Sequence, residues 1–225
     1  MLKPALAIMS RVPSVEGKSR LGAMLTPAQR EALQWALLED LLKKVSFIKE
    51  VECYLAVTPS SELDKIAKRV EFNGQVLPQS SGDLGQRMAN IALQLFLRGH
   101  APVILIGTDV PLLSPAHLHK AQYLLGQSDL VFGPALDGGY YLIGMRKFTA
   151  RVFKGISWGS ERVLEDTLKI CKENKLSFAL LDSLMDIDRP HDLLALMSEF
   201  ESKKIDTASI PERTIWFLKS VNIKS

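Results

Sequence analysis

The stretch "PVILIGTDVPLL", residues 102–113, decides the fold class. Its first half is an apolar run without polar alternation, which is typical of a strand in a parallel sheet that helices cover on both faces. A loop with Asp109 and Pro111 follows, and Ser114-Pro115 then offers a capping residue with proline at the first helical position. Strand, loop and helix in this order predict a unit of an α/β fold.

The same alternation extends along nearly the whole chain. Thr26-Pro27 and Thr58-Pro59 repeat the cap-then-proline pattern, and apolar residues recur at helical spacing from Leu33 to Val45. We therefore predict an α/β fold with a mostly parallel central sheet and helices on both faces. The other strand candidates are "ALAIM" (5–9), "ECYLAV" (52–57), "GQVL" (74–77), "DLVFG" (129–133), "YYLIGM" (140–145) and "SFALL" (177–181).

One domain over residues 1–200 accounts for this pattern. Beyond it, residues 201–225 hold the apolar cluster "TIWFLKSV" (214–221), which has no obvious place in the sheet. We expect this C-terminal extension either to pack on the core or to form a contact in a homodimer.

Composition excludes several classes of protein. The chain has 225 residues, 47% of them hydrophobic and 24% charged, with a net charge of +3. These are ordinary values for a globular domain, and the charge is too small to indicate nucleic-acid binding. No apolar run approaches the ~18 residues that a membrane span needs, and Cys53 and Cys171 are predicted to be free, buried thiols. We expect a cytoplasmic protein without nucleic-acid or membrane partners.

Two acidic loops are candidate metal sites, since ligands of open α/β sheets bind at the carboxyl ends of the strands. Asp109 follows an apolar strand, where it either coordinates Mg²⁺ or Mn²⁺ or only stabilises its own turn. In "DIDRP", residues 186–190, Asp186 and Asp188 lie on one side of an extended segment. Asp188 is the second candidate ligand, although it is also a good helix N-cap.

The stretch "GKSRLG", residues 17–22, resembles the end of a phosphate-binding P-loop, but the spacing excludes that motif because no glycine precedes Gly17. What remains is a basic loop that holds Arg11, Lys18 and Arg20. These cations either clamp phosphates or form a solvated surface. Two acidic loops and one basic loop together are what a metal–diphosphate site requires.

Two glycine-containing loops have two interpretations each. In "GPALDGGYYLIGM", residues 133–145, Asp137, Gly138 and Gly139 predict a turn between strands, although glycines also allow a backbone to approach a ligand. In "SSGDLGQRM", residues 80–88, Asp83 either contacts a base or ribose or belongs to a plain connection. The aromatic residues near these loops are expected in the core: Tyr140, Tyr141 and Trp158.

Taken in order, these motifs resemble one family. The basic loop with "KSRL", then "GDLGQRM", "IGTDVPLL", "GPALDGGYYLIGM", "GISWGSERV" and "DIDRPHDL", are similar to the bacterial glycosyltransferase-like proteins of the GT-A fold. That family is related to the molybdenum-cofactor and phospholactate guanylyltransferases. The resemblance covers residues 6–194 and implies the Rossmann-like fold of the nucleotide-diphospho-sugar transferases, with a nucleotide and a divalent cation bound.

The resemblance also implies roles for individual residues. Asp109 matches the aspartate that coordinates the metal, and Asp188 matches that of the late acidic motif. Lys18 and Arg20 match the residues that face the phosphates. Asp83 matches the loop near the nucleoside, and the hairpin from Asp137 to Tyr141 matches the acceptor side.

Three functions compete on these grounds. The first is a metal-dependent transferase that moves a sugar from a nucleoside diphosphate to a small acceptor, with Lys18 and Arg20 stabilising the departing nucleotide and Asp137 as the base. The second is a nucleotidyltransferase that joins an NTP to a phosphorylated small molecule and releases pyrophosphate, in which Asp137 only binds. The third is a nucleotide-binding module without turnover.

Overall fold

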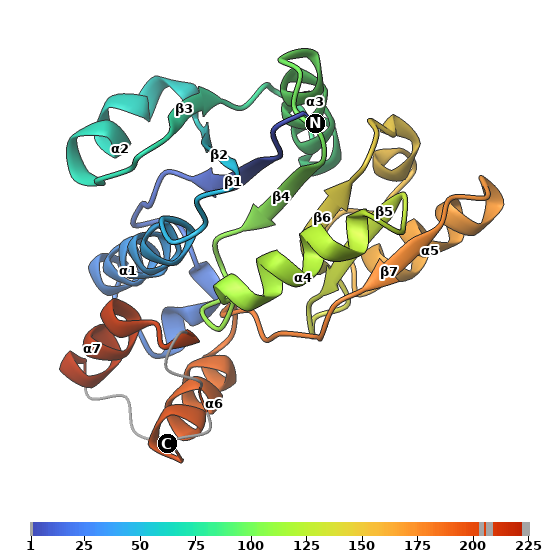
Figure 1. The fold of residues 1–225 in the computed structure, drawn as a ribbon. Helices are drawn as coiled ribbons and strands as arrows, with labels where there is room; N and C mark the ends of the chain where they lie inside the picture. The colour runs from blue at the N-terminus through green and yellow to red at the C-terminus, as the bar shows by residue number, and fades with distance from the viewer. Residues whose placement is uncertain (1, 203–204, 206–208, 222–225) are drawn as a thin grey trace.

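The computed structural model describes residues 2–202, 205 and 209–221, and its centre is a sheet of seven strands (Figure 1). The strand order is β3-β2-β1-β4-β6-β5-β7. Each predicted apolar run forms a strand: β1 (Ala5–Arg11), β2 (Glu52–Thr58), β3 (Gln75–Pro78), β4 (Val103–Gly107), β5 (Leu130–Pro134), β6 (Tyr140–Met145) and β7 (Phe178–Leu180).

One strand, β6, runs against the others. It pairs antiparallel with both β4 and β5, while all other pairs are parallel, so the predicted mostly parallel sheet is confirmed. The register pairs Ile106 with Leu142, which places Tyr140, the first residue of β6, at the edge where β4 ends. The hairpin between β5 and β6 therefore lies at the carboxyl edge of the sheet.

Helices cover both faces of the sheet (Figure 1). Leu6 and Ile8 of β1 pack in one core cluster with residues of α1 (Pro27–Val45), α2 (Leu63–Arg69) and α4 (Pro115–Leu125). The alternate residues Ala5 and Ala7 pack in a second cluster with α3 (Leu84–Leu97), the 3-10 helix η3 (Ala150–Phe153) and α5 (Val163–Glu173). This two-sided burial is why the strands are apolar without alternation.

A third cluster joins the C-terminal region to the start of α1. It combines Leu33 and Leu37 with the 3-10 helix η1 (Ser19–Ala23), α6 (Pro190–Glu201) and α7 (Glu212–Ser220). Along α1, Leu41 and Val45 pack in the sheet-facing cluster, whereas Leu33 and Leu37 pack with the C-terminal helices. Helix α7 buries Ile215 and Leu218 against this cluster, whereas Trp216 is 73% exposed. The domain boundary at residue 200 and the oligomer contact stay predictions, and residues 203–204, 206–208 and 222–225 of the extension lie outside the described residues.

Helix starts follow the predicted caps in two of three cases. Thr26 caps α1 in a capping box with Gln29, and Ser114 precedes α4. The prediction at Thr58-Pro59 is wrong, because Thr58 is still paired with Arg11 in the sheet. The chain there first forms the 3-10 helix η2 (Ser60–Glu62), and α2 begins only at Leu63 without a side-chain cap.

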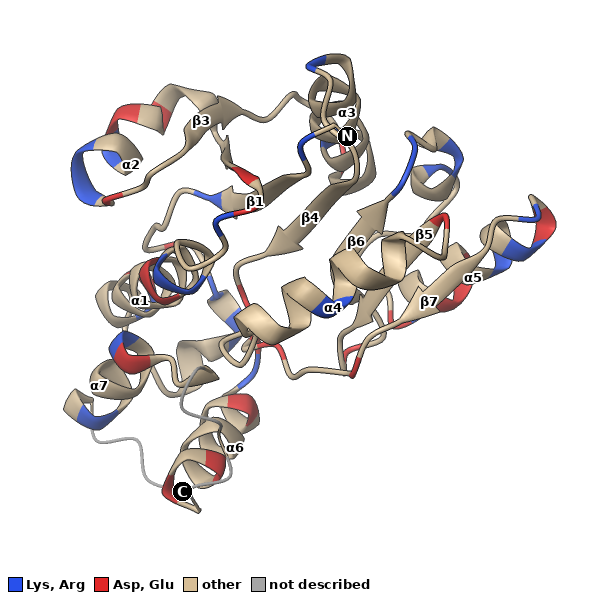
Figure 2. Ribbon diagram, in the orientation of Figure 1, with Lys and Arg blue, Asp and Glu red and all other residues tan. Residues whose placement is uncertain are grey.

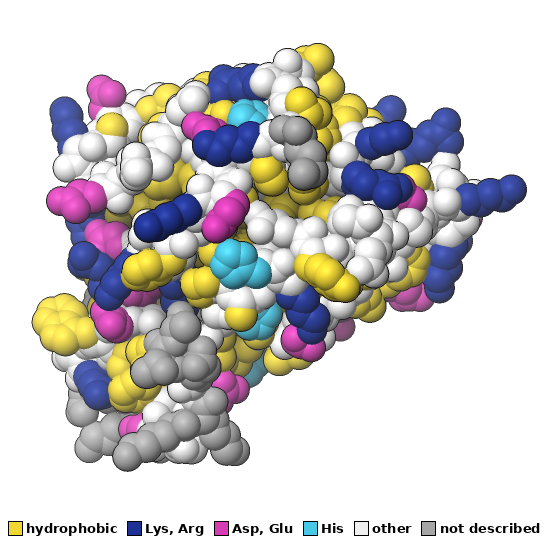
Figure 3. All heavy atoms as spheres, viewed as in Figure 1, with side chains coloured by type: hydrophobic (Ala, Val, Ile, Leu, Met, Phe, Trp, Pro, Cys, Tyr) yellow, Lys and Arg dark blue, Asp and Glu magenta, His cyan; other side chains and the backbone are white. Residues whose placement is uncertain are grey.

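The exterior carries mixed charge. On the face shown in Figure 3, lysine and arginine side chains are interspersed with aspartate and glutamate, in keeping with the small net charge. Within the described ranges, no helix has the length and apolar character to cross a membrane.

Candidate active site

A cavity of about 670 Å³ opens at the carboxyl edge of the sheet. Its walls come from the end of β1 and the loop after it, the loop after β4, the start of α3, the first residues of β6 and the loop before α6. Most of the strand-following loops that the sequence analysis selected thus meet in one place. Figure 2 shows basic and acidic segments of the chain converging there.

The basic loop is fixed to helix α1. Gln34 donates from Nε2 to the carbonyl of Ser14 at 2.8 Å, and Arg30 donates to the carbonyls of Val15 at 2.8 Å and Gly17 at 3.1 Å. Lys18 follows in the left-handed region, with φ of 52°, and η1 begins directly after it. Hydrogen bonds from α1 therefore fix the backbone of the loop that carries Lys18, and the loop is not a freely solvated surface.

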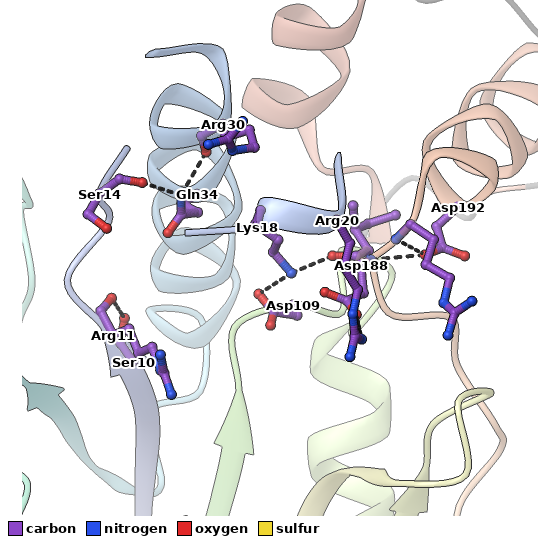
Figure 4. A network of polar contacts seen from close by, with 12 residues as sticks. Ser10, Arg11, Ser14, Lys18, Arg20, Arg30, Gln34, Asp109, Asp188 and Asp192 are labelled. Atoms are coloured by element: carbon purple, nitrogen blue, oxygen red, sulfur yellow. Dashed lines mark hydrogen bonds and ion pairs between the residues drawn. The ribbon is translucent and has the colours of Figure 1, made fainter. Parts of the chain in front are cut away.

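Lys18 joins the basic loop to both acidic loops. Its side chain is only 6% exposed, and Nζ lies 2.9 Å from Oδ1 of Asp109. Nζ also donates to the carbonyl oxygen of Ile187, while the backbone N–H of Ile187 donates to the carbonyl of Asp109 at 2.8 Å. Asp109 itself is half exposed and lines the cavity. Figure 4 shows the lysine pointing at this carboxylate.

Arg20 and Asp188 form a second ion pair beside the first (Figure 4). Asp188 lines the cavity, whereas Arg20, whose side chain is largely exposed, does not. The alternative interpretation of Asp188 as a helix cap is wrong, because α6 begins at Pro190 and the carboxylate of Asp192 accepts the backbone N–H groups of Asp188 and Arg189. The carboxylate of Asp188 thus does not cap α6: one of its oxygens faces Arg20, and the residue lines the cavity.

A further carboxylate, Asp186, lies close to the two ion pairs. Burial, and next the negative charge of Asp137, raise the pKa of Asp186 to about 6, while the charge of Lys18 acts in the opposite direction. This places Asp137 near the acidic loop, although it does not line the cavity. Its Oδ1 accepts the backbone N–H of Gly139 at 2.8 Å, so the turn that the sequence predicts is present.

The start of α3 supplies the opposite wall. Asp83 caps the helix by accepting the N–H of Gln86 at 2.8 Å, and it stays outside the cavity lining. The lining residues here are Leu84, Arg87 and Met88, together with Gln79 from the end of β3. The sequence did not predict Arg87 and Gln79 as site residues. The motif at the start of α3 indicated its capping residue, Asp83, as the candidate instead.

An aromatic wall connects the remaining motifs. Trp158 and Tyr140 pack edge to face, with centroids 6.2 Å apart, and both line the cavity with Tyr141. The indole lies against Gly85, where a Cβ atom would come within 2.5 Å of Nε1. Any larger residue at this position would displace the ring. The motifs "GDLGQRM" and "GISWGSERV" are therefore in direct contact.

The glycines of the hairpin serve packing. Gly138 has φ of +89°, and a Cβ there would overlap the backbone of Glu161. Its carbonyl accepts the N–H of Leu164 at 3.0 Å. Neither Gly138 nor Gly139 lines the cavity, and their predicted contact with a nucleotide stays a prediction.

The carboxylates fit a divalent cation only when a substrate completes its coordination. Asp109 and Asp188 each offer oxygen donors at the cavity, and one oxygen of each already faces a cation. Among the described residues, no group of three or more potential ligands surrounds a common point. Mg²⁺ characteristically binds in this way, through one or two carboxylates plus substrate phosphates.

The fold is like that of the nucleotide-diphospho-sugar transferases, and the protein is a transferase. A family model described as "Uncharacterized protein conserved in bacteria (DUF2064)" matches residues 41–160, and the chain belongs to this family. A solved structure from Desulfovibrio desulfuricans G20, described as a "putative nucleotide-diphospho-sugar transferase", superimposes with a TM-score of 0.88. The two sequences are 27% identical, and the match covers 98% of this chain and 95% of the other.

Two curated relatives are similar over most of their length. The 2-phospho-L-lactate guanylyltransferase of Methanococcoides burtonii is 26% identical over 80% of this chain and 78% of its own length. The 3-phospho-D-glycerate guanylyltransferase of Phenylobacterium zucineum is 28% identical over 84% of this chain and 87% of its own. These findings confirm the predicted GT-A-like family, its relation to guanylyltransferases, the fold class and the transferase assignment.

Proposed function

We propose that this protein is a nucleotidyltransferase that joins a nucleoside triphosphate to a phosphorylated small molecule and releases pyrophosphate. The names of the two curated relatives support this reaction over sugar transfer. They also make GTP the first nucleotide to test, and phosphorylated hydroxy acids the first acceptors.

The charge pattern of the cavity is the observation that carries the proposal. Three cations, Arg11, Lys18 and Arg87, line a single cavity together with the carboxylates Glu16, Asp109 and Asp188. A triphosphate and a phosphorylated acceptor bring several negative charges into one space, which cations and a metal ion must neutralise. A neutral sugar acceptor would need fewer cations.

The chemistry needs no general base. An oxygen of the acceptor phosphate attacks the α-phosphorus of the nucleotide, the bond from this phosphorus to the oxygen bridging to the β-phosphate breaks, and pyrophosphate leaves with the electron pair. The nucleophile is already an anion, so the enzyme mainly positions the reactants and stabilises charge. The carboxylate of Asp137, engaged with its own turn, then has a positioning role only.

Each candidate residue has a defined task in this proposal. Lys18, held by the carbonyl of Ile187, neutralises phosphate charge at the centre of the cavity. Arg20 orients Asp188 through their ion pair. Asp109 and Asp188 hold Mg²⁺ or Mn²⁺, which supplies charge stabilisation to the phosphates when it is bound.

Thermal stability measurements test the nucleotide preference directly. Melting temperatures of the wild type, Asp109→Asn and the control Asp64→Asn are recorded with GTP or a GDP-sugar, each with Mn²⁺ or EDTA. Asp64 is exposed on α2, so its loss leaves the cavity unchanged. A ligand of the folded state raises the melting temperature by mass action.

The proposal predicts that GTP with Mn²⁺ stabilises the wild type and the control more than the GDP-sugar does. EDTA and Asp109→Asn both reduce this gain. Stabilisation by the GDP-sugar and not by GTP would favour sugar transfer instead. No stabilisation by any nucleotide at millimolar concentration would overturn both.

A further inference from the structure

Two arginines on the α3 side of the cavity form no ion pair with the residues that the structure describes. Arg11 is the last residue of β1 and Arg87 lies in the first turn of α3, and both line the cavity. In the part of the chain that the structure describes, no carboxylate lies within ion-pair distance of either guanidinium. Figure 4 shows Arg11 at the end of β1, apart from the Lys18 and Arg20 pairs.

Two neutral oxygen atoms accept hydrogen bonds from the Arg87 side chain. Its Nη1 donates to Oε1 of Gln79 at 3.3 Å, and its Nε donates to the carbonyl of Asp83 at 3.4 Å. Gln79 is buried and fixed in turn, because its Nε2 donates to the carbonyls of Ser10 at 3.1 Å and Ala56 at 2.8 Å. A guanidinium has five N–H donors, so most of its donors remain for a ligand.

The charge environment of Arg87 also favours a bound anion. Burial, and next the like charge of Arg11, lower the pKa of Arg87, while the negative charge of Asp83 acts in the opposite direction without outweighing them. A half-buried cation beside a second cation is unfavourable unless an anion comes between them. The buried anchor at Gln79 nevertheless keeps Arg87 at the cavity wall.

We propose that Arg11 and Arg87 form a second anion-binding subsite, which takes a phosphate group of a substrate. It is distinct from the Lys18 subsite, where the ammonium group already faces Asp109 and the carbonyl of Ile187. The inference rests on the proposed function, since a reaction between two phosphorylated substrates needs two places for phosphate charge. Arginine suits this role because its planar donors bind phosphate oxygens in pairs.

The phosphate has two possible sources with the same chemistry. It belongs either to the nucleotide, as the part that leaves as pyrophosphate, or to the acceptor. Separate probes distinguish them: inorganic pyrophosphate and GTP report on the first, and 3-phospho-D-glycerate reports on the second.

Isothermal titration calorimetry in EDTA measures each probe without the metal. The variants are Arg87→Gln, Arg11→Gln, Arg87→Lys and the control Arg98→Gln. Arg98 follows the far end of α3 and donates to Gln75 at 3.0 Å, away from the cavity. Circular dichroism and melting temperature establish that each variant is folded.

We expect Arg87→Gln and Arg11→Gln each to weaken at least one probe about tenfold or more, the loss typical of a charge-assisted hydrogen bond. Arg87→Lys keeps the charge but lacks the paired donors, so we expect its affinity for the probe to lie between those of the wild type and Arg87→Gln. Arg98→Gln stays within twofold of the wild type. A loss confined to pyrophosphate and GTP assigns the subsite to the nucleotide, and a loss confined to 3-phospho-D-glycerate assigns it to the acceptor.

The proposal is overturned if both glutamine variants bind all three probes within twofold of the wild type, or if the folded wild type binds none at millimolar concentration. Its failure is separable from failure of the proposed function. If the probes bind but no pyrophosphate is released, the proposed function is refuted and the subsite proposal is not. If both glutamine variants turn over with unchanged KM values, the subsite proposal is refuted and the proposed function is not.

Discussion

Replacing Asp40 by alanine should loosen the C-terminal helix from the rest of the molecule. Asp40 lies on α1 and is 4% exposed. Its carboxylate accepts the backbone N–H of Arg213 at 2.9 Å, and the N–H and hydroxyl of Thr214, each at 2.8 Å. It therefore satisfies the first free N–H groups of α7 from a neighbouring helix.

The size of the loss follows from these three bonds. Each hydrogen bond to a charged acceptor is worth about 1.5–3 kcal/mol. Alanine leaves two backbone donors without their partner, while it also removes the desolvation cost of the carboxylate, so the sum is reduced. We expect Asp40→Ala to lower the free energy of unfolding by about 3–5 kcal/mol, as when one partner of a buried charged pair is removed. Asp40→Asn keeps one acceptor oxygen and loses less.

Urea unfolding, followed by circular dichroism, measures this change as a shift in midpoint at constant slope. Lys43→Ala is the matched control, because Lys43 also joins α1 to α7, through an ion pair with Glu212 in which both side chains are more than half exposed. Solvent screens such a pair, and its loss should be far smaller. An Asp40→Ala variant that loses less than about 1 kcal/mol, or no more than the control, would refute the reasoning.

Three further perturbations follow from single residues. Burial lowers the pKa of Lys44 to about 8, below its value of 10.5 in the unfolded chain. As the pH rises, the folded state therefore loses this proton before the unfolded state does. The free energy of unfolding, measured by urea titration, should rise by about 2 kcal/mol between pH 7.5 and 9.5 in the wild type relative to Lys44→Met. Gly138→Ala should cost about 2–4 kcal/mol in the same assay, more than Gly155→Ala, because both have positive φ but only Gly138 also meets neighbouring backbone. Burial raises the pKa of Cys53 and Cys171 to about 11, so both thiols should react with Ellman's reagent far more slowly in the folded protein than in urea near pH 8.

The strands could be predicted because each has a local sequence pattern, a short apolar run, that can be recognised without knowledge of the tertiary structure. A run such as residues 102–107 is apolar on both faces, and only a strand covered on both sides needs that. The direction of β6 is different, since a short apolar run carries no mark of parallel or antiparallel pairing. The turn at Asp137 to Gly139 was the only local sign of a reversal there.

The candidate site could be predicted where chemistry coincides with a strand end, as at Asp109. It could not be predicted where a residue's task depends on a distant partner. Asp188 resembles a helix cap in sequence, and only the folded chain shows that Arg189 occupies the N-cap position, with Asp192 accepting the N–H groups of Asp188 and Arg189. Arg87 looks like an exposed helical residue until Gln79 and Arg11 are placed beside it.

The most direct test of the central claim is pyrophosphate release. Wild-type protein is mixed with GTP, Mg²⁺ and either 3-phospho-D-glycerate or 2-phospho-L-lactate, with Asp109→Asn and Asp64→Asn beside it. The account predicts pyrophosphate that appears only with a phosphorylated acceptor, in equal amount to a guanylylated product identified by mass spectrometry, and that is lost in Asp109→Asn alone. Release of GDP from a GDP-sugar without any pyrophosphate from GTP, across a panel of acceptors, would contradict it.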